Sequence, residues 1–425
     1  MKKVLALLLV AAMALSLAGC TGNKGTENNN GGNGGTATET TSSDLAGTYD
    51  IVIWVPDAAV ELTKTQIANF NSSNADGITI NATVEAVSEA EAATNMITDV
   101  EAGGDIYFFA QDQFARLVQA GAVSKLGVAA AETVSSANDP GVVAAATTGS
   151  DMYAYPLTSD NGYFMYYDKS VISEDIVDSL EDIIAACEAA NKNISFEMNT
   201  SAWYLASFFF GCGCTSVWEC DNDGNFIGVQ DDFNSANGLI AAKGIKKLVD
   251  SPIFVSSSSG SDFDSGSAVV VTGQWDYATV EAILGDNMGC TDLPSFTVDG
   301  QQYHIGSFNG CKLLGVKPQT DAKKGAALHK LAQYLTSYEC QMERYETLAW
   351  GPANSEAQAS DAVQANPGLS ALFKQNAYSV PQGQIHGSWW DLAKVIGDDI
   401  KAATDDAGLQ AALDNYEAKI NALFE

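Results

Sequence analysis

The sequence has few of the residues on which most catalytic sites and nucleic-acid surfaces depend. It contains 3 histidines in 425 residues, with no His-Glu-x-x-His helix and no Gly-x-Ser-x-Gly turn. No glycine-rich stretch matches a phosphate-binding loop. Lys and Arg number 21 against 53 Asp and Glu, so the surface field repels phosphate backbones. We therefore expect no catalytic residue, no metal, no cofactor and no nucleic-acid partner.

Long apolar runs are scarce as well. The run at residues 4–17 follows Lys2 and Lys3 and is shorter than the ~20 residues that a membrane-spanning helix needs. A basic start, an apolar run and small residues together are typical of a secretory signal. The run ends in Leu17-Ala18-Gly19-Cys20, which resembles the lipobox of bacterial lipoproteins, in which the cysteine is lipidated. The alternative is an ordinary signal with a chance cysteine.

The segment after Cys20 is rich in Gly, Asn, Thr and Ser, which is typical of a flexible linker. We expect residues 1–19 to be a lipoprotein signal peptide and residues 20–47 to be a lipidated flexible tether. The protein would then be anchored to the outer face of the cell membrane by lipid alone.

The other seven cysteines are an odd number, so at least one stays unpaired. Export permits disulfides, and we expect them between Cys290 and Cys311, or between Cys220 and either Cys212 or Cys214. Buried free thiols are the alternative. Cys212 and Cys214 lack the two-residue spacing and the nearby histidines of a zinc site.

One acidic segment has a partial calcium-loop pattern. In residues 221–225, Asp-Asn-Asp-Gly-Asn, the glycine falls at the fourth position, where an EF-hand loop needs it at the sixth. The Asp-Gly pair favours a β-hairpin turn instead.

Predicted strands and helices alternate along the body of the chain. The first series has strands at 50–55, 78–87 and 105–110 and helices at 61–71, 88–101 and 114–122. The second has strands at 153–157, 162–167, 194–198 and 268–272 and helices at 174–190, 201–210, 236–250 and 276–284. Later helices are expected at 323–335, 339–348, 369–373, 390–402 and 410–424. This alternation predicts an α/β fold made of two successive units.

Tryptophan is the informative residue type. Trp203, Trp275, Trp389 and Trp390 stand beside polar or small residues near the ends of predicted elements. Such rings suit carbohydrate, because a pyranose has an apolar C–H face and a rim of hydroxyls. A tryptophan taken singly is more often a core residue. The doublet at 389–390 is harder to bury completely, because adjacent helical residues point about 100° apart.

Several segments together resemble the bacterial extracellular solute-binding proteins of sugar ABC transporters, of the maltose/maltodextrin-binding type. They are residues 51–54 (Ile-Val-Ile-Trp), 104–114, 153–157, 272–277 (Thr-Gly-Gln-Trp-Asp-Tyr) and 387–390 (Gly-Ser-Trp-Trp). The resemblance implies an α/β, two-lobed periplasmic-binding-protein-like fold with discontinuous lobes joined by hinge crossovers. The N-terminal lobe would comprise 48–157 and 306–352, and the C-terminal lobe 158–305 and 353–425. The crossovers would lie near 156–161, 301–306 and 351–355.

The resemblance also implies ligand-binding residues in the cleft between the lobes. The expected ligand-binding residues are Glu91, Phe109, Asp112, Asp160, Trp203, Tyr204, Trp275, Tyr277, Trp389 and Trp390. Phe109 stands where a tryptophan is usual, and Gln113 replaces an arginine, so the stacking surfaces are kept while some polar contacts change.

The resulting hypothesis is a membrane-anchored, monomeric receptor, not an enzyme. It would capture an oligosaccharide, an α-glucan such as maltodextrin, and deliver it to the permease subunits of an ABC importer. The alternatives are a solute-binding lipoprotein for a different sugar or a non-sugar ligand, and a secreted carbohydrate-active enzyme.

Overall fold

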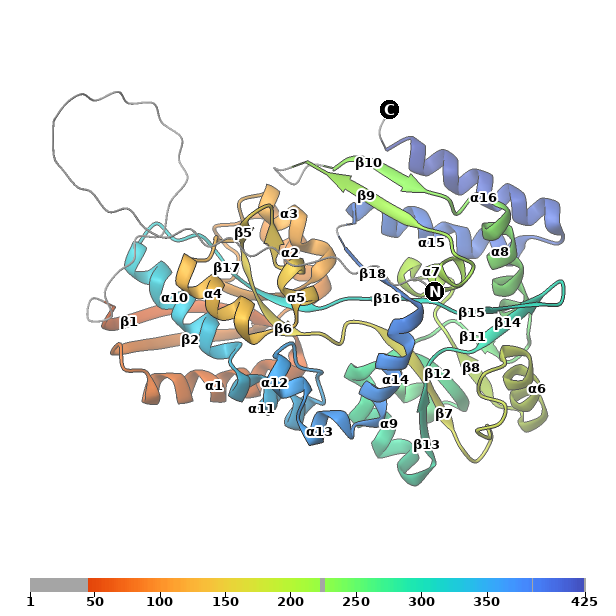
Figure 1. Ribbon diagram of the computed structural model, residues 1–425, viewed down its shortest axis with the longest axis horizontal. Coiled ribbons are helices and arrows are strands. Elements are labelled where there is room, and N and C mark those ends of the chain that lie inside the picture. Colours follow the sequence, from red (N-terminus) through yellow and green to blue (C-terminus); the bar gives the residue numbers. More distant parts are fainter. Residues whose placement is uncertain (1–44, 222–225, 384, 424–425) are drawn as a thin grey trace, which may run out of the picture. The chain divides into compact units, whose positions relative to one another are not determined.

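The computed structural model describes residues 45–221, 226–383 and 385–423, which form two five-stranded sheets with helices around each (Figure 1). The signal peptide, Cys20 and most of the expected tether lie outside the described residues. The first sheet has the order β2 (Ile78–Ala86), β1 (Gly47–Val55), β3 (Ile106–Ala110), β17 (Lys312–Val316), β6 (Ala154–Thr158). β1 is parallel to β2 and β3, whereas β17 is antiparallel to β3 and β6. A strand from late in the chain is thus inserted into a sheet built by its beginning.

The second sheet has the order β11 (Phe254–Val255), β8 (Asn193–Ser195), β12 (Ser267–Gly273), β7 (Tyr163–Asp168), β13 (Met288–Thr291). β8 is parallel to β11 and β12, and β7 is antiparallel to β12 and β13. All seven residues of β12 are buried. A strand that is buried along its whole length is typical of a sheet that is covered on both faces.

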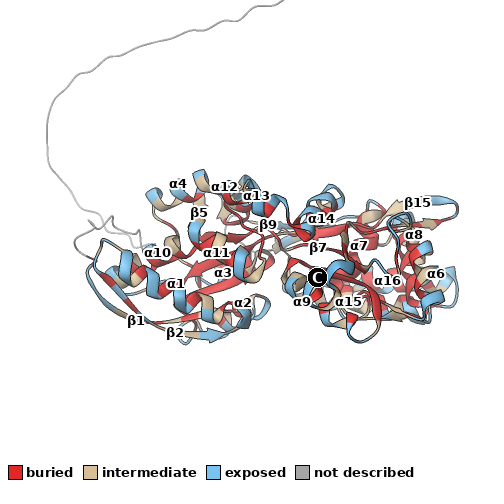
Figure 2. Cartoon of the chain, turned by 90° about the horizontal axis from the view of Figure 1, so that it is seen from below, coloured by how far each residue is buried: buried red, intermediate tan, exposed pale blue. Residues whose placement is uncertain are grey.

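Helices cover both sheets. Those of the first are α1 (Val60–Ser73), α2 (Glu89–Thr98), α3 (Phe114–Gln119), α4 (Val128–Ala137), α5 (Pro140–Ala145), α10 (Ala322–Leu335) and α11 (Tyr338–Leu348). Those of the second are α6 (Leu180–Ala190), α7 (Ala202–Gly211), α8 (Ala236–Val249), α9 (Tyr277–Leu284), α14 (Pro367–Gln375), α15 (Gly387–Ala402) and α16 (Asp406–Asn421). Figure 2 shows buried residues along the strands and exposed residues on the outer helix faces. The two-lobed α/β fold expected from the sequence is confirmed.

Short elements complete the fold. Four two-stranded sheets pair β4 (Thr147–Thr148) with β5 (Asp151–Met152), β9 (Ser216–Cys220) with β10 (Phe226–Asp231), β14 (Ser295–Val298) with β15 (Gln301–His304), and β16 (Ser307–Asn309) with β18 (Ser379–Pro381). α12 (Ser355–Gln358) and α13 (Asp361–Gln364) precede α14. The antiparallel β9–β10 pair confirms the predicted hairpin, whereas its turn residues 222–225 are not described.

Most predicted elements are present, with shifted ends that have local causes. α6 begins at Leu180 rather than at 174, because the Ser179 side chain accepts a hydrogen bond from the Asp182 backbone N–H and caps the helix there. α14 begins at Pro367 rather than at 369, since Asn366 caps it and proline suits the first helical position. Strands β4, β5, β11, β13, β14, β15 and β18 were not predicted.

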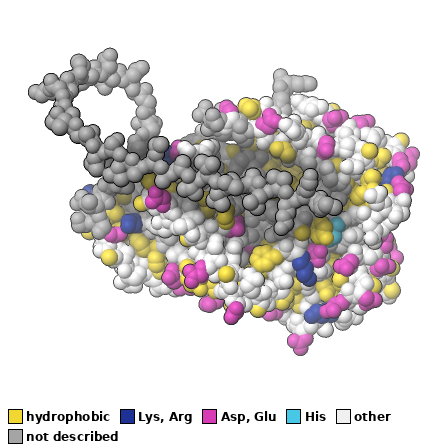
Figure 3. Space-filling model, in the orientation of Figure 1, with side chains coloured by type: hydrophobic (Ala, Val, Ile, Leu, Met, Phe, Trp, Pro, Cys, Tyr) yellow, Lys and Arg dark blue, Asp and Glu magenta, His cyan; other side chains and the backbone are white. Residues whose placement is uncertain are grey.

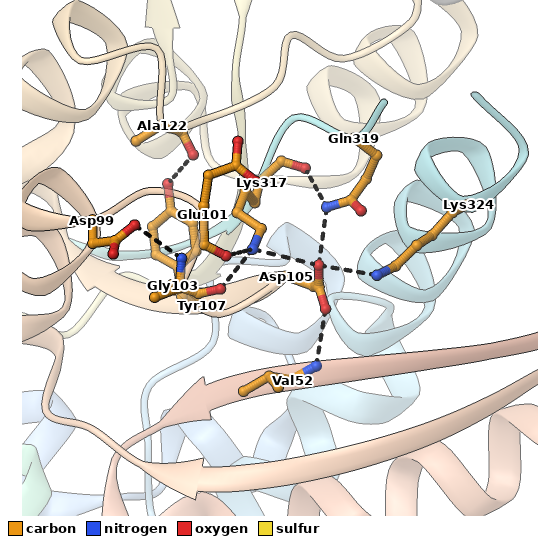
Figure 4. Close-up of polar contacts among 11 residues, drawn as sticks. Val52, Asp99, Glu101, Gly103, Asp105, Tyr107, Ala122, Lys317, Gln319 and Lys324 are labelled. Atoms are coloured by element: carbon orange, nitrogen blue, oxygen red, sulfur yellow. Dashed lines mark hydrogen bonds and ion pairs between the residues drawn. The ribbon is translucent and has the colours of Figure 1, made fainter. Parts of the chain in front are cut away.

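A buried carboxylate joins the elements of the first sheet (Figure 4). Asp105 Oδ2 accepts a hydrogen bond from the Val52 backbone N–H at 3.0 Å. Asp105 Oδ1 accepts one from Gln319 Nε2 at 3.0 Å and lies 3.2 Å from Lys324 Nζ. Lys317 Nζ, 3.7 Å from the same oxygen, also donates to the backbone oxygen of Gly103 at 2.7 Å. This contact set ties β1 to the segments that flank β3, β17 and α10.

The expected disulfides are absent among the described cysteines. Cys290, Cys311, Cys212 and Cys214 are all free thiols, so neither proposed pairing of these residues forms, and the buried-thiol alternative holds for them. Burial raises the pKa of the Cys187 thiol to about 12, as it does for Cys212 and Cys214. These thiols therefore act as small apolar core groups.

The structure also shows how charged residues, apolar helices and potential metal ligands are distributed. In Figure 3, Asp and Glu side chains are scattered over the visible face, and the whole chain has a net charge of −32. No helix within the described ranges is both long and apolar enough to cross a bilayer. Within the same ranges, no group of three or more His, Cys, Asp and Glu side chains could hold a metal ion.

Candidate ligand-binding cavity

Three segments pass between the two sheets, and hydrogen bonds hold them together. The first is the link from β6 to β7, the second lies between β16 and β17, and the third follows α11. The Ser159 backbone N–H donates to the Gly351 oxygen at 3.1 Å, and the Asn161 N–H donates to the Gly310 oxygen at 3.2 Å. The second crossing segment lies at residues 310–311, whereas the sequence predicted a crossover near residues 301–306. These hydrogen bonds join the three segments into one connected strip between the lobes, and a cavity lies next to it.

A cavity of about 590 Å³ opens beside this strip. Its lining residues come from both lobes and from the crossing segments: Pro56, Ala58, Glu89, Ala90, Ala110, Asp112, Gln113, Asn161, Trp203, Trp275, Lys312, Trp350, Gln382 and Trp390. Four of them are tryptophans, and most of the others are polar. The volume and the mixture of rings with a few polar groups are typical of small-molecule binding sites.

The tryptophans reach the cavity from four different elements. Trp203 lies on the first turn of α7, Trp275 follows β12, Trp350 follows α11, and Trp390 lies on the first turn of α15. The ring centroids of Trp203 and Trp275 are 5.9 Å apart. A Cβ at Gly273 would come within 2.2 Å of the Trp275 ring, so glycine there lets the indole lie against the backbone. The cavity thus has flat apolar surfaces on several sides.

Asp112 supplies a buried carboxylate to the cavity wall. Asp112 is 4% exposed and follows β3. Gln113 Nε2 and Gln382 Nε2 both donate hydrogen bonds to its carboxylate oxygens, the latter at 2.8 Å. Burial raises the pKa of Asp112 to about 6, although the hydrogen bond from Gln113, the charge of Arg116 and the hydrogen bond from Trp390 oppose the shift. At neutral pH this carboxylate is ionised and can accept hydrogen bonds from ligand hydroxyls.

We expect Asp112→Asn to change how stability depends on pH. The folded pKa of Asp112 lies above the usual 3.8, so the wild type loses stability as pH rises from about 4 to about 6. The variant lacks this loss, and its unfolding free energy relative to wild type should rise by about 2 kcal/mol between pH 4 and pH 7. Urea unfolding at several pH values measures the difference.

A surface aspartate serves as the control for this measurement. Asp151 accepts a hydrogen bond from Lys125, and this lowers the pKa of Asp151. Asp151→Asn should therefore change the relative stability in the opposite sense. A relative stability of Asp112→Asn that stays constant across the range would contradict the raised pKa.

Lys312 and Glu89 form an ion pair in the same wall. Lys312 Nζ lies 2.8 Å from Glu89 Oε1, and the side chains are 11% and 14% exposed. The ammonium lies 4.7 Å from the ring centroid of Trp350 and 5.6 Å from that of Trp275. Burial opposes the charge, but the carboxylates of Glu89 and Asp160 outweigh it and raise the pKa of Lys312. Lys312 is therefore a fixed cation in the cavity.

Four of the predicted ligand-binding residues line the cavity: Asp112, Trp203, Trp275 and Trp390. Asp160 lies behind the wall, 3% exposed, where one of its oxygens accepts a hydrogen bond from the Gly351 N–H at 2.5 Å and holds two crossing segments together. Burial raises the pKa of Asp160, against the opposing charge of Lys312. Its position indicates a structural role in the strip.

Three predicted rings lie in the core instead of the cavity wall, and the expectation is corrected for them. Phe109 is 0% exposed and stacks on Phe114, because on β3 it faces away from the side where Ala110 lines the cavity. Tyr204 and Trp389 are 5% and 1% exposed, and each is the inward member of a helical doublet. Their neighbours Trp203 and Trp390 take the cavity positions.

Two further predicted residues lie away from the cavity. Glu91 is exposed and accepts a hydrogen bond from the Ser88 hydroxyl at 3.2 Å, while Glu89, on the same helix, lines the wall. Tyr277 lines a different depression, next to Tyr345. The sequence reasoning missed Glu89, Lys312, Trp350, Asn161 and Gln382. The Trp350-Gly351-Pro352 segment beside an expected crossover was the available signal for Trp350.

Two α/β lobes joined by three crossing segments, with a ring-lined cavity beside them, define a two-lobed ligand-binding protein. A model of the bacterial extracellular solute-binding protein family matches residues 65–371, which is more than half of the chain, and the protein belongs to this family. Such proteins are extracytoplasmic components of ABC transport and are not enzymes, as the sequence predicted. No curated protein sequence matches the chain.

Solved structures give the same fold. A structure described as a complex with acarbose is 27% identical, with a TM-score of 0.78, and the match covers 89% of this chain and 100% of that one. The maltodextrin binding protein MalE1 from L. casei BL23 is 22% identical, with a TM-score of 0.74 and coverage of 88% and 99%. The GacH receptor of Streptomyces glaucescens GLA.O is 18% identical, with a TM-score of 0.71 and coverage of 88% and 99%. At their level of identity, the last two show similarity of fold alone.

Proposed function

We propose that the protein captures a neutral oligosaccharide, an α-glucan such as maltodextrin, in the tryptophan-lined cavity. The observation that carries the proposal is the presence of four indoles from four elements around one cavity of about 590 Å³ that also has carboxylate and amide groups. Indole faces stack on pyranose C–H faces while polar side chains bind the hydroxyls. The similarity to a structure described as a complex with acarbose supports the same ligand class.

The proposal extends to delivery. The two lobes contribute residues to the same cavity, so a bound ligand makes contacts that stabilise a closed arrangement of the lobes. A permease of an ABC importer would accept the loaded protein. Lipidation at Cys20 and a flexible tether up to residue 47 would keep the receptor near that permease at the cell membrane. We propose the lobe boundaries predicted from the sequence, except that the second part of the N-terminal lobe begins after the crossing segment at residues 310–311.

Calorimetric titration of the purified protein with maltotriose and maltotetraose tests ligand capture. We expect stoichiometric binding without turnover, and we expect Trp275→Ala to weaken it by about 1 to 3 kcal/mol through lost stacking area. Trp54→Ala is the control, because Trp54 lies on β1 outside the cavity wall, with its Nε1 hydrogen-bonded to Glu85. No response to any neutral oligosaccharide at millimolar concentration would count against the proposal and favour a non-sugar ligand.

A further inference from the structure

The ion pair between Lys312 and Glu89 lies in the wall of the proposed sugar site, and ring stacking makes no use of it. Both side chains are nearly buried and line the cavity. A buried ion pair seldom stabilises a fold by itself, because the loss of hydration can cost as much as the attraction returns. Its place beside four tryptophans therefore points to a role in binding.

The pair is held rigidly on one lobe. Lys312 is the first residue of β17, where it pairs with Ala110 of β3 and Thr158 of β6. Glu89 is the first residue of α2, and the positive end of a helix dipole favours a carboxylate at that position. The rings of Trp275 and Trp350 flank the ammonium. Both charged groups are thus positioned before any ligand arrives.

Both members of the pair have unused hydrogen-bonding capacity. A lysine ammonium has three N–H donors, and among the described residues Lys312 Nζ makes a polar contact with Glu89 alone. Glu89 Oε1 lies 2.8 Å from this ammonium, and a carboxylate has two oxygens with about four acceptor positions. Glu89 can therefore also accept a hydrogen bond from a ligand hydroxyl in the cavity.

We propose that Lys312 and Glu89 together bind two neighbouring hydroxyls of the ligand, so that Lys312 is a specificity-determining residue. The ammonium donates to the oxygen of one hydroxyl, and the carboxylate accepts the hydrogen of the next. Adjacent ring hydroxyls present an acceptor and a donor side by side, as this pair requires. The inference rests on the proposed function and narrows it to sugars whose stacked residue has a free vicinal diol.

Calorimetric titration of the whole protein with maltotriose and with its single-deoxy derivatives tests the assignment. Lys312→Met keeps much of the apolar stem and removes the donors, and we expect it to weaken maltotriose binding by about 10- to 100-fold. For the deoxy derivative that lacks the hydroxyl bound by Lys312, variant and wild type should have nearly equal affinities. Lys330→Met, which removes a half-exposed lysine on α10, is the control and should bind like wild type.

The outcomes separate this assignment from the proposed function. If the wild type binds no maltotriose, both fail. If the wild type binds maltotriose and Lys312→Met binds it equally well, the assignment alone is overturned. The same holds if Lys312→Met lowers the affinity for maltotriose and for every deoxy derivative by the same factor, because a merely structural role affects all ligands alike. Should Lys312→Met fail to fold, Glu89→Gln goes through the same comparison, since it keeps the shape of its side chain.

Discussion

Trp389→Ala should lower the free energy of unfolding by about 3 to 5 kcal/mol and leave ligand affinity largely unchanged. The indole is 1% exposed, and its Nε1 donates to the Tyr416 hydroxyl at 2.9 Å. Its ring also packs on Phe233 and Phe308, with centroids 6.3 Å and 6.0 Å away. Truncation leaves a cavity where α15, α16 and α7 meet. Urea denaturation measures the loss, and titration with maltotriose measures the affinity.

The adjacent residue gives the matched control. Trp390 lines the ligand cavity, so Trp390→Ala should weaken oligosaccharide binding by about 1 to 3 kcal/mol and cost less stability than Trp389→Ala. The two variants remove the same side chain from neighbouring positions of one helix. A loss of binding in Trp389→Ala together with intact binding in Trp390→Ala would show that the two rings have exchanged roles.

This pair also illustrates what the sequence alone can predict. The alternation of strands and helices predicted two α/β units. The tryptophan doublet on a helix was expected to be hard to bury completely, because adjacent helical residues diverge by about 100°, and both rings were expected to bind ligand. Which ring faces the core depends on how the helix packs on its neighbours. For both doublets, 203–204 and 389–390, only the tertiary structure shows which ring is buried and which lines the cavity.

The polar residues were harder to predict for a different reason. Glu89 and Lys312 are far apart in the chain, and they meet because β17 is inserted next to β3, with the start of α2 beside it. A lysine at the end of an apolar strand carries no local signal of a binding role. Glu91 lies on the same helix as Glu89, but residues two positions apart on a helix point about 200° apart. Glu91 therefore faces solvent while Glu89 lines the cavity.

In the sequence, Asp105 begins a predicted strand and belongs to the segment 104–114 that resembles the solute-binding family, and neither feature predicts the role that the structure gives it. Its carboxylate is 10% exposed and lies against two lysines, a backbone N–H and an amide (Figure 4). It is not among the residues that line the ligand cavity. The charged partners come from 317 and 324, beyond β17. Asp105 therefore fastens the late part of the chain to the sheet that the early part forms.

We expect Asp105→Ala to lower the free energy of unfolding by about 3 to 5 kcal/mol, because it leaves the ammonium groups of Lys317 and Lys324 without their buried counter-charge and the Val52 N–H without an acceptor. Asp105→Asn keeps the shape and should recover only part of the loss. Asp99→Ala, at an exposed turn where the carboxylate accepts one hydrogen bond from the Ala102 N–H, should cost under about 1 kcal/mol. Urea denaturation of the three variants decides the matter: equal stability of Asp105→Ala and Asp99→Ala would mean that β1, β17 and α10 hold together by apolar packing alone.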